Sequence, residues 1–363
     1  MQLFANSFAI VPDPRADNAR HDLIEILFIA FVAILCGCKT CVEIVEFAVA
    51  KKPFFTKIIS LKHGIPSHDT FSTVFRMLDP KALDEAFRKF MAAFGMALAD
   101  RGIIAIDGKA LKGAYEKGKK NAPKMMVSAF AADMRMTLAS LEAKGRNEVD
   151  AALEILGLVD LKGKIVTADA LHANRAMAQA IINRGGDYCL ALKENQPSLL
   201  SEARAILDKA GPKTPAAESS EKGRGRVEKR RAIVVKAPGL AEHHEFAGLK
   251  AFGRIEATRQ IDGEIKTEVR IYALSFVPKP AELLHVARAH WQIENGLHWE
   301  LDVVMGEDKN RSRKDNAAQN IAVLRRLALN VARSDTAKGS LAGKLRRAGW
   351  NEDFLLTLLG QTR

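Results

Sequence analysis

The stretch Ile103-Ile104-Ala105-Ile106-Asp107-Gly108 marks the point where the sequence changes from helical to sheet-forming. A short apolar run that is stopped by Asp-Gly is typical of a buried β-strand with its acid at the edge. The same pattern, an apolar run followed by an aspartate, returns in Lys164-Ile165-Val166-Thr167-Ala168-Asp169. We therefore expect two strands that each carry an aspartate where the strand ends.

Further strands and helices surround these two runs. Residues 125–132 and 136–142 predict an antiparallel hairpin. Residues 149–156 and 173–183 have helical periodicity, and residues 187–193 predict another strand. The order is three strands, helix, strand, helix, strand, which describes a mixed α/β sheet with antiparallel hairpins at its start.

Residues 200–280 break this rhythm and predict a β-rich insertion between the sheet and a final helix. Residues 210–226 are rich in Lys, Pro, Ser and Gly, so we expect a loop there. Residues 232–236, 249–260 and 266–276 are β-like, and Asp262-Gly263 predicts a hairpin turn between the last two segments.

Both ends of the chain are predicted to be helical. Residues 1–100 form an all-helical module, in which Asp22 caps one helix and Ser67 or Asp69 caps a later one. The module either binds DNA or packs on the next domain, and the sequence leaves both open. We expect the α/β domain to comprise residues 101–199 and 281–335. A helical tail, with an amphipathic helix over residues 350–359, follows as residues 336–363.

The composition favours a polyanionic partner. The chain has 55 Lys and Arg against 43 Asp and Glu, a formal net charge of +12 at pH 7, which favours nucleic acid over an anionic membrane surface. The longest apolar run, residues 26–38, is shorter than the roughly 20 residues of a membrane span, so we expect no membrane partner. Cys36, Cys38 and Cys41 lack a second Cys/His pair at zinc-ribbon spacing, which indicates buried thiols in a reducing cytoplasm.

A second dense stretch, His290-Trp291-Gln292-Ile293-Glu294-Asn295-Gly296-Leu297-His298-Trp299-Glu300-Leu301-Asp302, lies on the helix that Pro280 opens. Acids from two strands and a helix are what a two-metal phosphoryl-transfer site needs. Glu294, Glu300, Asp302 and Glu307 are all available as the third acid. We expect Trp291 and Trp299 to be core anchors, because both lie on an amphipathic helix.

Four motifs follow one another in the chain: Ile106-Asp107-Gly108-Lys109, Ala168-Asp169-Ala170-Leu171-His172, Lys193-Glu194-Asn195-Gln196-Pro197 and His290-Trp291-Gln292-Ile293-Glu294-Asn295. Their joint order and spacing resemble those of the H-repeat-associated insertion-sequence transposases, which are ribonuclease-H-like DDE transposases. The resemblance extends to residues 64–71 and 307–313, so it covers nearly the whole chain.

This resemblance implies a ribonuclease-H-like mixed sheet and metal-dependent DNA strand cleavage and strand transfer. Asp107, Asp169 and Glu294 would hold two Mg²⁺ (or Mn²⁺) ions about 3.5–4 Å apart, because hard oxygen ligands select these ions over zinc. Glu294 is singled out because Trp-x-Ile-Glu lines up with the catalytic glutamate of the related cut-and-paste enzymes. The partner would be double-stranded DNA, at transposon ends and target. We expect a homodimer on DNA, associated with the bacterial nucleoid.

The related enzymes also carry phosphate-contacting residues on the glutamate helix, and His290, Ala287 and Leu301 stand at those positions here. Contacts to DNA are therefore expected from other basic residues as well. His298 follows Glu294 by one turn and shares its face, as a partner of the site or as a core histidine. The candidates for DNA contact are Lys109, Lys193, Arg226, Arg288, His290, His298, Lys309, Arg311 and Arg313.

Two other functions stay open at this point. The fold would also suit a nuclease or resolvase that acts on structured DNA without transposition. A non-catalytic DNA-binding protein descended from a transposase is the third reading. The presence of acids at all three positions argues against a pure DNA binder, which would tolerate the loss of one.

Overall fold

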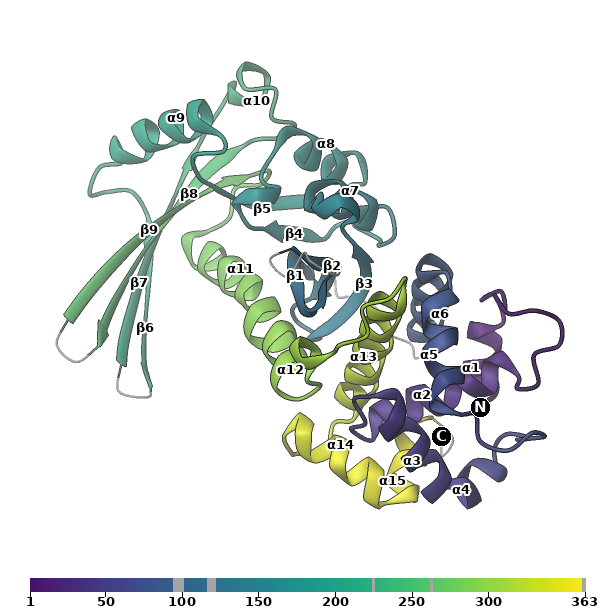
Figure 1. Cartoon of the computed structure of the whole chain (residues 1–363). Coiled ribbons are helices and arrows are strands. Elements are labelled where there is room, and N and C mark those ends of the chain that lie inside the picture. Colours follow the sequence, from purple (N-terminus) through teal and green to yellow (C-terminus); the bar gives the residue numbers. More distant parts are fainter. Residues whose placement is uncertain (94–100, 116–121, 224–225, 262–263, 361–363) are drawn as a thin grey trace.

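A mixed β-sheet runs through the centre of this computed structural model, which describes residues 1–93, 101–115, 122–223, 226–261 and 264–360 (Figure 1). Nine strands lie in these described residues, in the order β3-β2-β1-β4-β5-β9-β8-β7-β6. Their bounds are β1 Ile103–Tyr115, β2 Pro123–Ala131, β3 Met136–Glu142, β4 Ile165–Ala168, β5 Asp187–Leu192, β6 Ala216–Gly223, β7 Arg226–Lys236, β8 Ala251–Ile261 and β9 Glu264–Leu274.

The first five strands have the expected ribonuclease-H-like arrangement. β1, β2 and β3 form an antiparallel meander, whereas β4 and β5 run parallel to β1. Parallel neighbours need a crossover, usually a helix. Helix α7 (Glu148–Leu156) supplies the crossover before β4, and α8 (Arg175–Asn183) supplies the one before β5. The mixed α/β fold that the sequence predicted is confirmed.

Strand β1 continues beyond the Asp-Gly pair, so the expectation that the strand ends there is wrong. Its parallel pairing with β4 does stop at Ile106, but its antiparallel pairing with β2 goes on as far as Tyr115. Gly108 pairs with Val127 of β2 and so does not form a turn, and the flexible carboxylate of Glu148 lies beside it.

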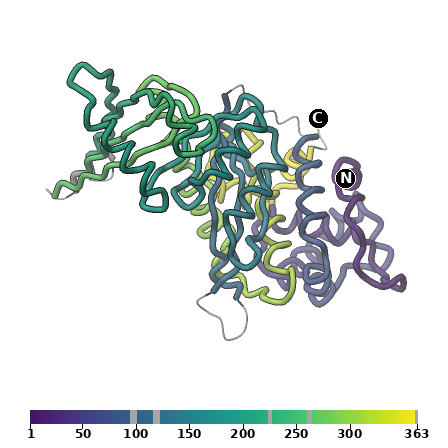
Figure 2. Tube along the Cα trace, turned by 90° about the horizontal axis from the view of Figure 1, so that it is seen from above, coloured from purple at the N-terminus to yellow at the C-terminus, as the bar shows by residue number. Residues whose placement is uncertain are grey.

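The segment expected as an insertion continues the same sheet. β5 pairs antiparallel with the last residues of β9, from Leu192 opposite Ile271 to Cys189 opposite Leu274. The remaining lengths of β6–β9 project away from the body of the molecule, and we call these four strands the arm (Figures 1 and 2).

Two details of this segment differ from the expectation. The loop predicted over residues 210–226 is partly a strand, because β6 pairs with β7 along its whole length as a polar edge strand. Helix α9 (Pro197–Asp208), between β5 and the arm, had no counterpart in the sequence analysis. The expected Asp262-Gly263 turn lies outside the described residues.

Helices from both ends of the chain share one core. The N-terminal helices pack with the C-terminal ones against the β3 side of the sheet, so the packing role of the N-terminal module is observed. The expected helix over residues 350–359 is present as α15 (Glu352–Leu358), which follows its N-cap Asn351, and the separate helix α14 (Leu341–Trp350) precedes it. The bounds are α1 Gln2–Phe8, α2 Leu23–Leu35, α3 Cys41–Ala50, α4 Lys52–Thr56, α5 His68–Met77, α6 Pro80–Ala93, α13 Ala317–Ser334, α14 Leu341–Trp350 and α15 Glu352–Leu358.

Local signals in the N-terminal helices match the structure. The Asp22 side chain accepts a hydrogen bond from the backbone N–H of Glu25 and caps α2, and Ser67 caps α5. Burial raises the pKa of Cys38 to about 12 and that of Cys41 to about 11, so both stay protonated thiols. No helix in the described part of the chain combines the length and the apolar character that a membrane span requires.

Candidate active site

The side chains of β1 alternate between two cores. Ile104 and Ile106 belong to the core under α7 and α8, whereas Ala105 belongs to the core that contains Ile293. Successive side chains of a strand point to opposite faces of the sheet. Asp107 therefore shares the face of Ala105, on the side where helix α11 (Pro280–Gln292) crosses the sheet.

Strand β4 presents its aspartate on the same face. Thr167 Oγ1 lies 3.2 Å from His290 Nδ1 on α11, which puts Thr167 under that helix. Ile106 and Ala168 are the last partners in the parallel ladder, so Asp107 and Asp169 are the next residue on each of two adjacent strands. The two aspartates are therefore neighbours at the end of the parallel ladder.

The third acid comes from an irregular part of the helix. After Gln292 the helix widens into a π-helical turn, Ile293–His298, before it continues as α12 (Trp299–Val303). Such π-turns inside α-helices are frequent at functional sites. Ile293 and Leu297 are buried, while Glu294 is exposed on the other side of the turn.

The charges of the other two acids act on the carboxylate of Asp107. Burial, followed by the negative charges of Asp169 and Glu294, raises the pKa of Asp107 to about 7. The backbone N–H of Gly108, 2.9 Å from Oδ1, opposes this rise. Like charges that share a site disfavour ionisation in this way. The arrangement is a set of carboxylates gathered from β1, β4 and the π-turn.

Asp169 has a partner that the sequence analysis did not single out. Burial raises the pKa of Asp169, but hydrogen bonding and the charge of His172 outweigh it, so the pKa is lowered. His172 is almost fully buried, and its Nδ1 lies 2.8 Å from Asp169 Oδ1. The signal was present in the sequence as an Asp-x-x-His spacing, which a short 3-10 turn converts into contact.

Two histidines of the late helix lie inside the site. Burial lowers the pKa of His290 to about 4 and that of His298 to about 3, so both are neutral at pH 7. His298 Nδ1 is 3.7 Å from Asp107 Oδ2. Because both rings are uncharged, they orient hydrogen bonds rather than attract phosphate by charge, and their contact with DNA stays a prediction.

The other acids of the late helix are occupied by basic partners. Glu300 pairs with Arg333, and Asp302 Oδ1 lies 2.6 Å from Lys109 Nζ. Glu307 Oε1 lies 3.0 Å from Arg326 Nη1. Glu294, in contrast, has no ion-pair partner among the described residues. This difference favours Glu294 as the third acid of the site.

Lys109 is not on the surface. Its side chain is 6% exposed, and its ammonium group lies 3.2 Å from Asp308 as well as 2.6 Å from Asp302. The ion pairs tie β1 to the short turn Glu307–Lys309. A contact between Lys109 and phosphate would have to compete with these carboxylates, so this contact also stays a prediction.

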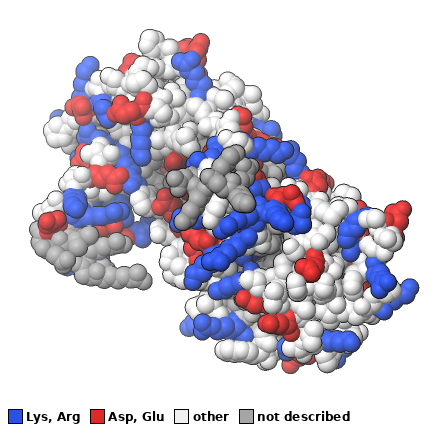
Figure 3. Space-filling model, in the orientation of Figure 1, with Lys and Arg blue, Asp and Glu red and all other residues white. Residues whose placement is uncertain are grey.

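The remaining candidates for DNA contact are spread around the site. Lys193, Lys309 and Arg311 are exposed, and Figure 3 shows Lys and Arg side chains gathered in the middle of one face. Arg313 stacks on the Tyr115 ring, with its guanidinium carbon 4.0 Å from the ring centroid. Arg288 pairs with Glu221 of the arm. The Arg226 side chain lies outside the described part of the structure.

A cavity of about 540 Å³ lies between α11 and the strands of the arm, which also contact each other directly. Trp291 lies in its wall, with the guanidinium carbon of Arg270 at 4.1 Å and that of Arg259 at 6.0 Å from the ring. Asn295, the neighbour of Glu294, also lines it, so the cavity reaches the edge of the acid cluster. The charged lining residues are Glu221, Glu228, Arg230, Arg259, Glu268, Arg270 and Arg288.

The two tryptophans of the late helix differ in their surroundings. Trp291 is half-buried beneath the arginines of the arm, whereas Trp299 is 56% exposed. The expectation that Trp299 is a core anchor is wrong. The π-turn explains the difference, because it changes the helical phase after Gln292 and turns Trp299 towards solvent.

Comparisons with family models and with individual proteins assign the chain to the same family. Residues 98–331 match the family described as Transposase DDE domain, and residues 5–91 match the one described as DDE_Tnp_1-associated. The H repeat-associated putative transposase YhhI of Escherichia coli (strain K12) is 32% identical, with 97% of this chain and 96% of that protein covered. Putative protein YbfL of the same strain is 33% identical over the same shares.

A solved structure is also similar over most of the chain. It is a piggyBac transposase synaptic complex with hairpin DNA, at a TM-score of 0.43 and 13% identity, with 98% of this chain and 76% of that chain covered. The sequence left three functions open: a transposase, a nuclease or resolvase, and a non-catalytic DNA-binding protein. The family match supports the transposase. The chain belongs to the DDE transposases, in the H repeat-associated subgroup.

Proposed function

We propose that Asp107, Asp169 and Glu294 hold two Mg²⁺ (or Mn²⁺) ions, with which the protein cuts the ends of an insertion sequence and joins them to target DNA. The observation that carries the proposal is that Asp107 and Asp169 directly follow the last paired residues of two adjacent parallel strands, beneath the helix that continues to Glu294. When bound, such ions activate the attacking oxygen and stabilise the leaving oxygen of a phosphoryl transfer.

The residues fit these ions in two respects. The three side chains offer only oxygen donors, the set that Mg²⁺ prefers. The negative charges of the three carboxylates repel one another, and a divalent cation bound between them would relieve this repulsion. Among the described residues, the oxygens of these three acids do not all fall within 4.8 Å of one another. A wider spacing suits two ions about 3.5–4 Å apart.

The surrounding residues of the chain position this cluster. His172 holds one oxygen of Asp169, which leaves the other oxygen free to ligate. Thr167 fixes the ring of His290 beside it. Glu294 owes its placement to the π-turn, whose buried Ile293 and Leu297 anchor the helix on the opposite side. Asp169 and Glu294 therefore have separate structural supports.

DNA would approach along the face that carries Glu294. The cavity under the arm begins one residue from Glu294, and its arginines and Trp291 suit a nucleic-acid strand. Exposed Lys193 and Arg311 add positive charge nearby. Double-stranded DNA at the transposon ends and at the target is the proposed partner. Two chains would act together because two ends are joined in one event.

A joining assay with matched variants tests this proposal. Glu294→Gln removes the charge of the third acid with little change in volume, and we expect Mg²⁺-dependent strand joining to fall to background. Glu85→Gln, at an exposed acid of α6, serves as the control and should join like the parent. Circular dichroism should show the same helix content in all three proteins. Full joining by Glu294→Gln or Glu294→Ala would overturn the assignment of the third ligand.

A further inference from the structure

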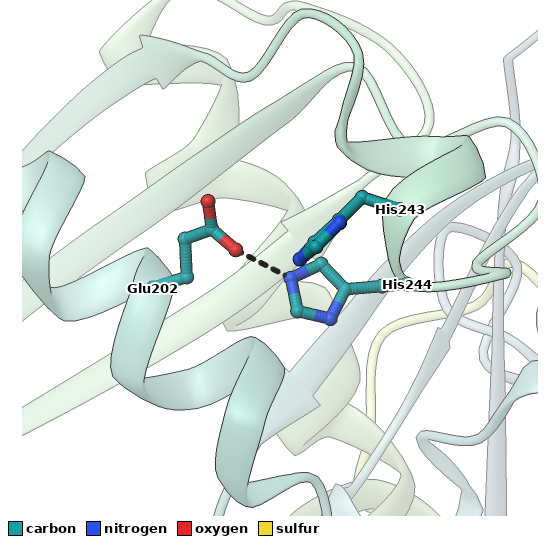
Figure 4. A group of neighbouring side chains, drawn as sticks. All are labelled: Glu202, His243 and His244. Atoms are coloured by element: carbon teal, nitrogen blue, oxygen red, sulfur yellow. Dashed lines mark hydrogen bonds and ion pairs between the residues drawn. The ribbon is translucent and has the colours of Figure 1, made fainter.

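A second group of possible metal ligands lies away from the acid cluster. Glu202 is on α9, and His243 and His244 end the short helix α10 (Leu240–His243) in the connection from β7 to β8. One ligand atom from each of the three residues lies within 4.8 Å of the other two. Figure 4 shows the three side chains converging from the two helices.

The ion pair between Glu202 and His244 explains the positions of these two side chains but not that of His243. His244 is buried, and its Nε2 lies 2.6 Å from Glu202 Oε2. His243 is exposed, and no hydrogen bond of its ring is seen among the described residues. Its ring nevertheless stands over the pair, with its centroid 4.8 Å from that of His244 and the two planes at 86°. The Glu202–His244 bond does not require this position of His243.

The group is separate from the catalytic acids. Leu199 and Leu200 of α9 and Phe246 after α10 belong to the core under α7 and α8. Asp107 and Asp169 lie on the other face of the sheet, under α11. An ion at Glu202 would therefore share no ligand with the acid cluster.

We propose that Glu202, His243 and His244 form a Zn²⁺ site that joins α9 to the connection between β7 and β8. Two imidazole nitrogens and one carboxylate oxygen are the donor set of zinc sites that keep a fourth position for water. Zinc bonds of about 2.0–2.2 Å put tetrahedral donors roughly 3.4 Å apart. Glu202 Oε2 and His244 Nε2, now 2.6 Å apart, would therefore move slightly apart to admit the ion, and side-chain rotation would bring the His243 ring to the same spacing. The cation takes the place of the proton in the Glu202–His244 bond.

The donor set also disfavours Mg²⁺ at this site. Mg²⁺ prefers oxygen ligands in octahedral geometry, and two of the three donors here are nitrogens. Zinc at this position would cross-link the base of the arm to the helix that follows β5. A ligand that binds only the folded chain stabilises it by mass action, so zinc should raise the thermal midpoint.

The test is a zinc titration of the full-length, metal-free protein against a chromophoric chelator, with excess Mg²⁺ present to occupy the carboxylate site. We expect one Zn²⁺ per chain in the parent. His243→Gln keeps the Glu202–His244 bond, so its thermal midpoint without zinc should equal that of the parent. Its zinc affinity should fall at least about tenfold, since even loss of an outer-shell partner typically costs that much.

Two further samples complete the design. His285→Gln, at an exposed histidine of α11, should bind zinc like the parent. Co²⁺ in place of zinc should give the visible absorption of a tetrahedral site in the parent and lose it in His243→Gln. Equal zinc affinity in the parent and in His243→Gln, or no zinc bound by the parent, would overturn the proposal. Neither readout depends on strand joining, so the proposed function is tested separately.

Discussion

His172 Nδ1 lies 2.8 Å from Asp169 Oδ1, and the histidine ring is almost completely buried between the sheet and the turn that follows β4. The bond fixes the orientation of a carboxylate that we propose as a metal ligand. A residue that hydrogen-bonds a metal ligand increases the affinity for the metal, because it holds the ligand in the orientation that binding needs.

His172→Ala should therefore raise the Mg²⁺ concentration needed for strand joining by about 10–100-fold. The measurement is the initial joining rate as a function of Mg²⁺ concentration. His68→Ala, at an exposed histidine, is the control. A purely structural role of His172 would lower the thermal midpoint without changing the Mg²⁺ dependence, and that result would refute the positioning role.

Asp84 on α6 predicts a pH-dependent stability. Burial raises its pKa to about 6, although Arg88 Nε and the Ser140 backbone N–H each lie 3.0 Å from its carboxylate. Between pH 3.8 and 6 the folded chain holds this proton more tightly than the unfolded chain. The free energy of unfolding therefore falls as the pH rises through this window, by on the order of 3 kcal/mol.

The comparison of the parent with Asp84→Asn isolates this effect from other titrating groups. Urea denaturation at pH 4, 5, 6 and 7 should show a fall that the Asn variant lacks. Asp17→Asn, at an exposed aspartate, should follow the parent. If the free energy of unfolding changed with pH in the same way in the parent and in Asp84→Asn, that result would contradict the raised pKa of Asp84.

The buried pair Glu307–Arg326 predicts a large loss of stability. Both side chains are 1% exposed, and their charged atoms lie 3.0 Å apart. Arg326→Met leaves Glu307 with Lys109, whose ammonium is 3.8 Å away. Breaking a buried pair in this way costs about 3–5 kcal/mol.

Urea denaturation of Arg326→Met, Glu307→Gln and the double variant measures this loss. The double variant should be less destabilised than the sum of the two single ones, because the pair is coupled. Arg346→Met, at an exposed arginine of α14, should change stability little. A loss under about 1 kcal/mol in Arg326→Met would show that the pair is not needed.

Because Trp299 is exposed, truncating its side chain should change the free energy of unfolding only slightly, whereas truncation of a core tryptophan would lower it strongly. Trp299→Ala should change the free energy of unfolding by no more than about 0.5 kcal/mol. Leu297→Ala, two residues away and fully buried, should cost about 2–5 kcal/mol. A loss above about 2 kcal/mol in Trp299→Ala would place that ring in the core instead.

Hydrophobic periodicity was enough to predict most of the central elements. The strands and helices around Asp107 and Asp169 were predicted because each buries one or two faces, and burial leaves an apolar pattern. The polar strand β6 was missed because it buries little and is stabilised by backbone pairing with β7. The extension of β1 was missed because Asp107-Gly108 has the composition of a turn but is held in the strand by backbone pairing with β2.

The candidate site was only partly predictable, because several of its features depend on contacts between distant parts of the chain. Glu294 could be chosen by alignment, but the ion pairs that occupy Glu300, Asp302 and Glu307 join residues far apart in the chain. Local sequence does not reveal such pairs. The π-turn, which sets the different exposures of Trp291 and Trp299, leaves no composition signal either.

A crystal structure with Mn²⁺ tests the central claim most directly, because anomalous scattering locates the ions without reference to activity. We predict two Mn²⁺ ions about 4 Å apart, ligated by Asp107, Asp169 and Glu294. Manganese held by Glu300, Asp302 or Glu307 in place of Glu294, or no manganese at Asp107 and Asp169, would contradict the account.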